Sequence, residues 1–351
     1  MVKDRLLTIN YPTALDVGST SPRKVRQVTG LPESNLLIAA IATPIGPDLR
    51  PNARLLAERC RTLMAAGCDG ITLFGTTGEG AEFAVADRQL TLESLLAAGI
   101  APSRLIVSVG ALAPADVVAL TAHATALGVA GVLLMPPCLF RSGIGEDGIF
   151  RFYATVIDRV GRDDLRLHLY HFPDISGVAL TPPVIHRLSE RYPRTIAGVK
   201  DSGGDLGFTE DLLRRFPYLQ IFTGSETHIP AVLASGGAGT ICGLANVIPG
   251  LLRHMIAGET LPDRRRYLPM VQAVDDILSR GPFIPALKAV IADQTGEPTW
   301  RQVVPPMAEL PLADEQRLLA DFRQLAATLP VAPQTAASTP SGIRAAVRAD
   351  G

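Results

Sequence analysis

The segment Thr195-Ile-Ala-Gly-Val-Lys-Asp-Ser-Gly-Gly-Asp205 begins as an apolar run, reaches a lysine and passes into a polar, glycine-rich stretch. A run that is continuously apolar, rather than alternating apolar and polar, is typical of a parallel strand that is buried on both faces. Seven further runs of this kind occur, separated by helix-patterned stretches such as residues 54–67 and 114–128. The expected strands are residues 36–43, 70–74, 105–109, 131–135, 167–170, 196–200, 220–223 and 239–242.

Eight consecutive strand–helix units predict an α/β fold, a (β/α)8 TIM barrel, because this barrel needs eight such units and ~250 residues. A doubly wound open sheet is the alternative, and the pattern alone separates the two poorly. We expect the barrel over residues 35–248 and C-terminal helices packed on it over residues 249–330. Residues 1–34 are polar and irregular and are predicted to be an N-terminal extension. Residues 331–351 are rich in Ala, Pro, Ser and Thr, which predicts a disordered tail.

The composition excludes several classes of protein. With 47% hydrophobic and 19% charged residues, the chain can form a large core. The net charge of −1 gives no basic excess for a nucleic acid or an anionic membrane. No apolar run approaches the ~20 residues that span a bilayer, and the first residues do not resemble a secretory signal. The four cysteines, Cys60, Cys68, Cys138 and Cys242, form no C-x-x-C pair. We therefore expect reduced thiols and a cytoplasmic location, with neither a nucleic-acid nor a membrane partner.

Lysine is rare in this chain, which makes each one informative. Only four of the 33 basic residues are lysine, namely Lys3, Lys24, Lys200 and Lys288, and arginine supplies the rest. Lys200 ends an expected strand, so its side chain would leave the barrel wall near the mouth. Desolvation there disfavours the charged ammonium, and an uncharged amine is the form that attacks a carbonyl. The alternative is a structural lysine paired with Asp201 or Asp205.

Two other strand ends carry polar groups. In Gly75-Thr-Thr-Gly-Glu79, glycines and threonine hydroxyls follow a strand, and such a turn can hold a carboxylate. An ordinary turn with a threonine cap is the alternative. In Leu167-His-Leu-Tyr-His-Phe-Pro173, Tyr170 ends the strand before Lys200. Since neighbouring parallel strands lie about 4.8 Å apart, the phenol and the amine could meet and exchange protons, although a purely structural tyrosine is equally compatible.

Cofactor and metal motifs are weak. Gly143-Ile-Gly-Glu-Asp-Gly148 fits G-x-G-x-x-G, but no strand precedes it directly and its two acids would repel a pyrophosphate. The six histidines show no spacing typical of metal ligands. We therefore expect neither a cofactor nor a bound metal.

Taken together and in order, these segments resemble the dihydrodipicolinate synthase / N-acetylneuraminate lyase family of Schiff-base aldolases. The resemblance covers about residues 36–310. The stretches that carry it are Ala42-Thr-Pro44, Gly75-Thr-Thr-Gly-Glu79, Tyr170-His-Phe-Pro173, Gly198-Val-Lys-Asp-Ser202 and Gly236-Gly-Ala-Gly-Thr-Ile241 with Ala245-Asn246. It implies a barrel enzyme, usually a homotetramer built as a dimer of dimers, that acts on pyruvate or another 2-oxo acid.

The resemblance also implies roles for individual residues. Lys200 would form the imine with the keto carbon, Tyr170 would shuttle protons, and Thr76 and Thr77 would hold the 2-oxo acid carboxylate or relay protons. The other positions that match the family's substrate contacts are Ser202, Ile241, Gly224 and Glu226.

Three departures bear on the substrate. The synthases carry an arginine after the tyrosine motif for the carboxylate of the aldehyde, where this chain has Asp174-Ile-Ser-Gly177. They also carry paired tyrosines after the fourth strand, where this chain reads Pro136-Pro-Cys-Leu-Phe140. Sialic-acid lyases have two acids after the seventh strand, and this chain retains only Glu226. The tyrosine motif looks closer to the 2-keto-3-deoxy sugar-acid aldolases.

We therefore predict a Schiff-base lyase that cleaves or forms a 4-hydroxy-2-oxo acid, with pyruvate as the keto partner and a 2-keto-3-deoxy sugar acid as the leading substrate. The alternatives are N-acetylneuraminate lyase, a related 2-oxo acid dehydratase and 4-hydroxy-tetrahydrodipicolinate synthase. An alternative of another class is a non-catalytic regulator that binds a 2-oxo acid.

Overall fold

The computed structural model describes residues 31–139 and 143–330. Eight parallel strands form one closed barrel in chain order, as predicted. Strand β8 pairs with β1, with Leu37 opposite Thr240, which closes the cylinder. The strands are β1 Leu36–Ala40, β2 Gly70–Leu73, β3 Leu105–Ser108, β4 Gly131–Leu134, β5 Leu167–His171, β6 Ile196–Asp201, β7 Gln220–Thr223 and β8 Gly239–Cys242. The alternative of an open sheet is therefore wrong.

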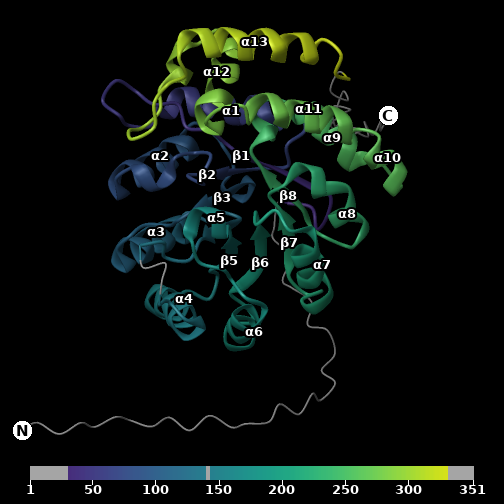
Figure 1. The fold of residues 1–351 in the computed structure, drawn as a ribbon. Coiled ribbons are helices and arrows are strands. Elements are labelled where there is room, and N and C mark those ends of the chain that lie inside the picture. The colour runs from purple at the N-terminus through teal and green to yellow at the C-terminus, as the bar shows by residue number, and fades with distance from the viewer. Residues whose placement is uncertain (1–30, 140–142, 331–351) are drawn as a thin grey trace, which may run out of the picture.

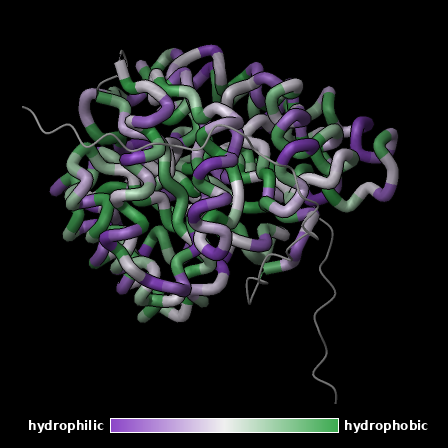
Figure 2. The backbone as a smooth tube through the Cα atoms, turned by 90° about the horizontal axis from the view of Figure 1, so that it is seen from below, coloured by the Kyte–Doolittle hydropathy of each residue, from purple (hydrophilic) through white to green (hydrophobic). Residues whose placement is uncertain are grey.

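Helices connect the strands and surround the barrel (Figure 1). The longer ones are α1 Ala53–Ala65, α2 Val85–Ala97, α3 Pro114–Ala126, α4 Glu146–Val160, α6 Pro182–Arg191, α7 Leu206–Arg215 and α8 Ile229–Ala234. Helix α5 Pro173–Ser176 is a single turn after β5, and the short 3-10 helices are η1 Gly80–Glu82, η2 Pro102–Arg104, η3 Glu226–His228, η4 Leu244–Asn246 and η5 Pro298–Arg301. In Figure 2 hydrophilic and hydrophobic stretches alternate along the tube at the periphery, as expected for helices with one buried face.

Five helices follow the barrel: α9 Pro249–Ala257, α10 Leu261–Arg265, α11 Leu268–Leu278, α12 Phe283–Thr295 and α13 Leu312–Ala326. Helices α11, α12 and α13 contact one another and lie together on one side of the barrel, at the top of Figure 1. The C-terminal part was expected to be helical, but residues 302–311 between η5 and α13 form no helix. None of the helices in the described ranges is both long and apolar enough to span a bilayer.

The alternation of side chains along each strand produces two cores. Leu36, Ile38 and Ala40 of β1 point into the barrel, where they share a cluster with Tyr170 and Ile241. Their neighbours Leu37 and Ala39 belong to the larger cluster between the barrel and its helices. Because the interior is filled with side chains, the barrel is a packed core and its chemistry is confined to the carboxyl ends of the strands.

Six expected strands have different ends in the structure. Strand β1 stops at Ala40 rather than Thr43, and β2, β3 and β4 each stop one residue earlier than expected. Strands β5 and β6 each continue by one residue, to His171 and Asp201. The expected N-terminal extension is described only from residue 31 onward, and the expected disordered tail, residues 331–351, lies outside the described residues.

Candidate active site

A cavity of about 610 Å³ opens among the strand ends and the first residues of α12. All eight residues singled out from the sequence line it: Thr76, Thr77, Tyr170, Lys200, Ser202, Gly224, Glu226 and Ile241. They follow or end five different strands, β2, β5, β6, β7 and β8, so the closed barrel is what brings them together.

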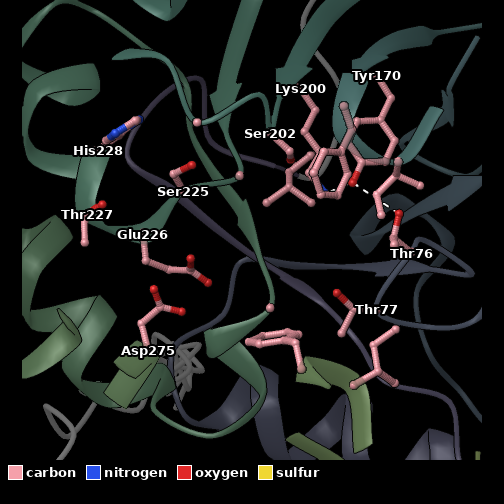
Figure 3. Close-up of a pocket in the computed structure, with 18 of the residues that line it drawn as sticks. Thr76, Thr77, Tyr170, Lys200, Ser202, Ser225, Glu226, Thr227, His228 and Asp275 are labelled. Carbon is pink, nitrogen blue, oxygen red and sulfur yellow. Dashed lines mark hydrogen bonds between the residues drawn. The ribbon is translucent and has the colours of Figure 1, made fainter. Parts of the chain in front are cut away.

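Lys200 and Tyr170 lie side by side because β5 and β6 pair in a register that places these two residues opposite each other. The Lys200 Nζ atom is 3.2 Å from the Tyr170 hydroxyl oxygen and 4.2 Å from the centre of its ring. Both side chains are buried, with 5% and 2% of their surface exposed. Figure 3 shows both side chains pointing into the cavity from neighbouring strands. An amine and a phenol thus share one desolvated wall.

The turn after β2 completes this group. The Thr76 Oγ1 atom is 3.4 Å from the Tyr170 hydroxyl, so amine, phenol and threonine form a hydrogen-bonded chain (Figure 3). Within the turn, the N–H groups of Gly78, Glu79 and Gly80 donate to the carbonyls of Gly75 and Thr76. Among the described residues, the N–H groups of Thr76 and Thr77 have no acceptor.

The segment that follows β1 supports this turn. The Thr43 hydroxyl donates to the Gly78 carbonyl at 2.7 Å. A side chain at Gly78 would place its Cβ 2.8 Å from the Ile41 carbonyl oxygen, so only glycine fits there. Asn246 holds the end of β1 by accepting from the Ala42 N–H and donating to the Ala40 carbonyl. Three motifs that are distant in the sequence therefore form one support for the threonine pair.

Close packing also restricts which residues fit next to Lys200. A Cβ atom at Gly224 would lie 2.0 Å from the Ser202 Oγ atom, which explains why a glycine follows β7. Asp201, next to the lysine, does not pair with it: its carboxylate accepts from the Thr209 hydroxyl and the Gly203 N–H. The alternative in which Asp201 is the ion-pair partner of Lys200 is therefore wrong.

Glu226 begins η3, and its carboxylate accepts from the Leu244 N–H at 2.8 Å. Burial raises the pKa of this carboxyl to about 7, although the Leu244 N–H opposes the shift, and the charge of Asp275 raises it further. Asp275 of α11 lines the same cavity and was not found from the sequence. In the sequence, the pair Asp275-Asp276 is typical of the solvent-exposed face of a helix. No expected strand ends just before it, so nothing indicated a position in the site.

Several apolar lining residues were also missed. Phe172 comes two residues after Tyr170, directly after β5, and Pro282, Phe283, Ile284 and Pro285 come from the start of α12. The sequence gives no signal that a helix after the barrel would reach back to the strand ends. The only hint is the unusual density of proline and large apolar residues at 282–285.

The histidines in the wall are structural. His168 is buried with its Nε2 atom 3.3 Å from the Gln220 Oε1 atom, and burial lowers its pKa to about 4. His171 accepts from the Leu180 N–H. In the part of the chain that the structure describes, no group of three His, Cys, Asp or Glu side chains could hold a metal ion. Cys60, Cys68, Cys138 and Cys242 carry free thiols.

Several known proteins are similar to this chain in sequence and in fold. The chain is 33% identical to a protein named as an uncharacterized DapA-like lyase of Chloroflexus aurantiacus, over 80% of this chain and 92% of that protein. It is 32% identical to the dihydrodipicolinate synthase of Agrobacterium tumefaciens, whose crystal structure matches with a TM-score of 0.77 over 83% of this chain and 99% of that one.

A variant of the Sulfolobus solfataricus 2-keto-3-deoxygluconate aldolase matches with a TM-score of 0.75 at 19% identity, over 83% of this chain and 96% of that one, which demonstrates a shared fold. Residues 33–324 match the model of the dihydrodipicolinate synthetase family, and this match covers most of the chain. The chain therefore belongs to the dihydrodipicolinate synthetase family, a family of lyases.

Proposed function

We propose that this protein is a Schiff-base lyase that cleaves or forms a 4-hydroxy-2-oxo acid, with pyruvate as the keto partner. The observation that carries the proposal is the buried contact of 3.2 Å between Lys200 Nζ and the Tyr170 hydroxyl at the wall of the cavity. A nucleophilic amine and a proton-transfer group within hydrogen-bond reach are the two requirements of imine formation.

In the first half of the reaction, the Lys200 amine attacks the keto carbon C2, and one amine proton passes to the former carbonyl oxygen. Tyr170 then donates its proton to the departing hydroxyl, which leaves as water. This step gives a protonated imine and a tyrosine phenolate. The Nζ atom that becomes the imine nitrogen lies 4.2 Å from the centre of the Tyr170 ring, whose negative face stabilises the cation.

In the second half, the phenolate takes the proton of the C4 hydroxyl. The C3–C4 bond breaks, the aldehyde leaves, and the electron pair of that bond moves into the imine to give a neutral enamine. The imine is the electron sink that makes this step possible. Tyr170 returns its proton to C3, and water hydrolyses the resulting imine to pyruvate and free Lys200.

The carboxylate of the 2-oxo acid would lie on the turn after β2. Thr76 and Thr77 line the cavity with their hydroxyls, and their N–H groups have no acceptor among the described residues. Successive N–H groups and hydroxyls at one turn form the concave donor set that binds anions. The Thr76 hydroxyl also contacts Tyr170 and can pass a proton to or from it.

The lining of the cavity favours an aldehyde without an anionic group. Lys200 is the only lysine or arginine among the described lining residues, and α5 occupies the stretch where the synthases carry their arginine. This supports a 2-keto-3-deoxy sugar acid over the substrate of a 4-hydroxy-tetrahydrodipicolinate synthase.

The sialic-acid lyase and dehydratase alternatives would use the same imine on Lys200. A non-catalytic regulator has no need of the Lys200–Tyr170 contact. The homotetramer and the cytoplasmic location remain predictions.

Borohydride reduction in the presence of pyruvate tests the proposal. The expected result is a covalent adduct on the peptide that contains Lys200, located by mass spectrometry, and its loss in Lys200→Arg, because guanidinium is not a usable nucleophile near neutral pH. Lys288 is the internal control, since its side chain is fully buried in an ion pair with Glu79. An adduct on Lys288, or full lyase activity in Lys200→Arg, would overturn the mechanism.

A further inference from the structure

Two carboxyl groups face each other across the end of the cavity that lies away from Lys200 (Figure 3). Glu226 comes from η3, directly after β7, and Asp275 comes from α11, outside the barrel. Both line the cavity, and their charges interact. The sequence motif after β7 contains one acid, and the fold of the C-terminal helices adds a second.

Each carboxyl group has a fixed position. Glu226 is held by the Leu244 N–H at 2.8 Å, next to the end of β8. Asp275 accepts a single longer hydrogen bond, 3.4 Å, from the hydroxyl of Ser279 on the same helix. Helix α11 packs against both α13 and η3, so the Asp275 backbone is anchored to the wall that carries Glu226. The Cys242 side chain at the end of β8 is a second hydrogen-bond partner of Glu226, and both acids line the cavity.

The electrostatic character of this end is acidic. Among the described lining residues, the only lysine or arginine is Lys200, which lies at the other end. His228 also lines the cavity, but its imidazole points away from both carboxyl groups in Figure 3. Burial raises the pKa of Asp275 as well as that of Glu226. The pair therefore avoids carrying two full negative charges, and a further anion would add to that repulsion.

We propose that Asp275, opposite Glu226, is a specificity-determining residue that selects 2-oxo acids whose far end carries hydroxyl groups and rejects those whose far end carries phosphate or carboxylate. The inference rests on the proposed function, because it takes Lys200 as the point where the substrate is attached. Carboxyl oxygens accept hydrogen bonds from hydroxyl groups, and like charges across a binding site exclude the wrong substrate. Two carboxyl groups at one end of the cavity offer several acceptors to the hydroxyl groups of a neutral polyol.

The test compares two six-carbon 2-keto-3-deoxy acids, one with a free C6 hydroxyl and one with a C6 phosphate, by the pyruvate that each releases. We expect the wild type to favour the neutral compound in kcat/KM by roughly tenfold or more, as one unfavourable charge contact implies. Asp275→Asn should reduce this preference at least fivefold, mainly by improving the phosphorylated compound. Glu210→Gln, which removes an exposed carboxylate of α7 outside the cavity lining, is the control and should leave the preference within twofold.

Borohydride trapping of pyruvate on Lys200 is measured for every variant and separates the two proposals. No adduct in the wild type would reject the proposed function. An adduct together with equal cleavage of the two acids, or with an unchanged preference in Asp275→Asn, would reject the role of Asp275 alone. If neither acid is cleaved while the adduct forms, the two acids are compared as competitors of adduct formation, and equal competition would again reject it.

Discussion

Lys288 and Glu79 form a fully buried ion pair, with the Nζ and Oε1 atoms 2.5 Å apart and neither side chain exposed. The other carboxylate oxygen, Oε2, accepts from the Val304 N–H at 2.7 Å. Glu79 ends the threonine turn in the left-handed conformation, with a φ of 54°. Lys288 lies on α12, whose first residue, Phe283, lines the cavity. The pair thus joins the expected carboxylate-binding turn to α12, the helix that lines the cavity with Phe283.

This pair also explains the second lysine of the described part of the chain. Burial lowers the pKa of Lys288, and the charge and hydrogen bond of Glu79 oppose that shift. Removing one partner of such a pair leaves an uncompensated buried charge, whereas removing both is far less costly.

Lys288→Met is expected to lower the free energy of unfolding by about 3–5 kcal/mol, since Glu79 would remain buried without a cation. Urea denaturation followed by circular dichroism measures the effect. The double variant Glu79→Gln with Lys288→Met should regain part of the loss. Arg54→Met, which removes an exposed pair with Glu58, is the control and should leave the midpoint nearly unchanged. A Lys288→Met protein as stable as the wild type would contradict the argument.

Glu226→Gln should change how stability depends on pH. The folded protein keeps a proton on Glu226 up to about pH 7, whereas the unfolded chain releases it near the ordinary value of 4.5. Folding therefore takes up a proton between these values, and stability falls as the pH rises through this window. The neutral amide removes that fall, so the variant should gain up to about 3 kcal/mol relative to the wild type between pH 4.5 and pH 8.

The measurement is the free energy of unfolding of both proteins at several pH values. Glu210→Gln, on an exposed position of α7, controls for the loss of a surface charge and should follow the wild-type profile. Parallel profiles for Glu226→Gln and the wild type would show that the carboxyl group is ionised in the folded protein at neutral pH.

The sequence predicted the barrel well because its signal is local. Each buried parallel strand is a continuous apolar run, so all eight could be placed to within three residues at their ends. That Lys200 and Tyr170 lie close together could be predicted from the order of the strands alone, because consecutive strands of such a barrel are adjacent. The strand ends were less certain because the backbone pairing of His171 and Asp201 leaves no trace in their polar side chains.

The missed residues have a common physical origin. Asp275 and Phe283 reach the cavity through the packing of helices after the barrel, which depends on contacts between distant segments. An amphipathic helix shows which face is buried but not what that face covers. Lys288 was recognised as rare, yet its partner Glu79 is 209 residues away and belongs to a motif that looked complete without it.

Gly224→Ala is expected to impair turnover without preventing folding. The new Cβ would lie 2.0 Å from the Ser202 Oγ atom and 3.3 Å from the Asp201 carbonyl, next to Lys200. A displacement of about 1 Å at a reacting group costs roughly 10²-fold in rate. Steady-state kinetics and the yield of the borohydride adduct measure the effect. Gly110→Ala is the control, because a Cβ there meets no atom within 4 Å. Unchanged kinetics in Gly224→Ala would mean that Ser202 moves freely.

Tyr170 and Tyr153 are two buried tyrosines with different partners, and they allow a matched comparison. The Tyr153 hydroxyl donates to the Leu134 carbonyl at 2.9 Å, behind β4 and outside the cavity lining. The Tyr170 hydroxyl contacts Lys200 and Thr76 inside the cavity. Loss of either hydroxyl removes a buried polar group, but only one of the two lies where a proton must move.

Tyr170→Phe should lower turnover by roughly 10²-fold or more, the usual cost of losing a positioned proton shuttle. The ring that faces Lys200 is kept, so the borohydride adduct with pyruvate should still form, but more slowly, because water must supply and remove the protons. Tyr153→Phe should lower the melting temperature and leave the rate of adduct formation unchanged. Stopped-time trapping and coupled pyruvate detection separate the two effects. Wild-type turnover in Tyr170→Phe would show that Thr76 or water moves the protons. The 3.2 Å contact between Lys200 Nζ and the Tyr170 hydroxyl would then be structural.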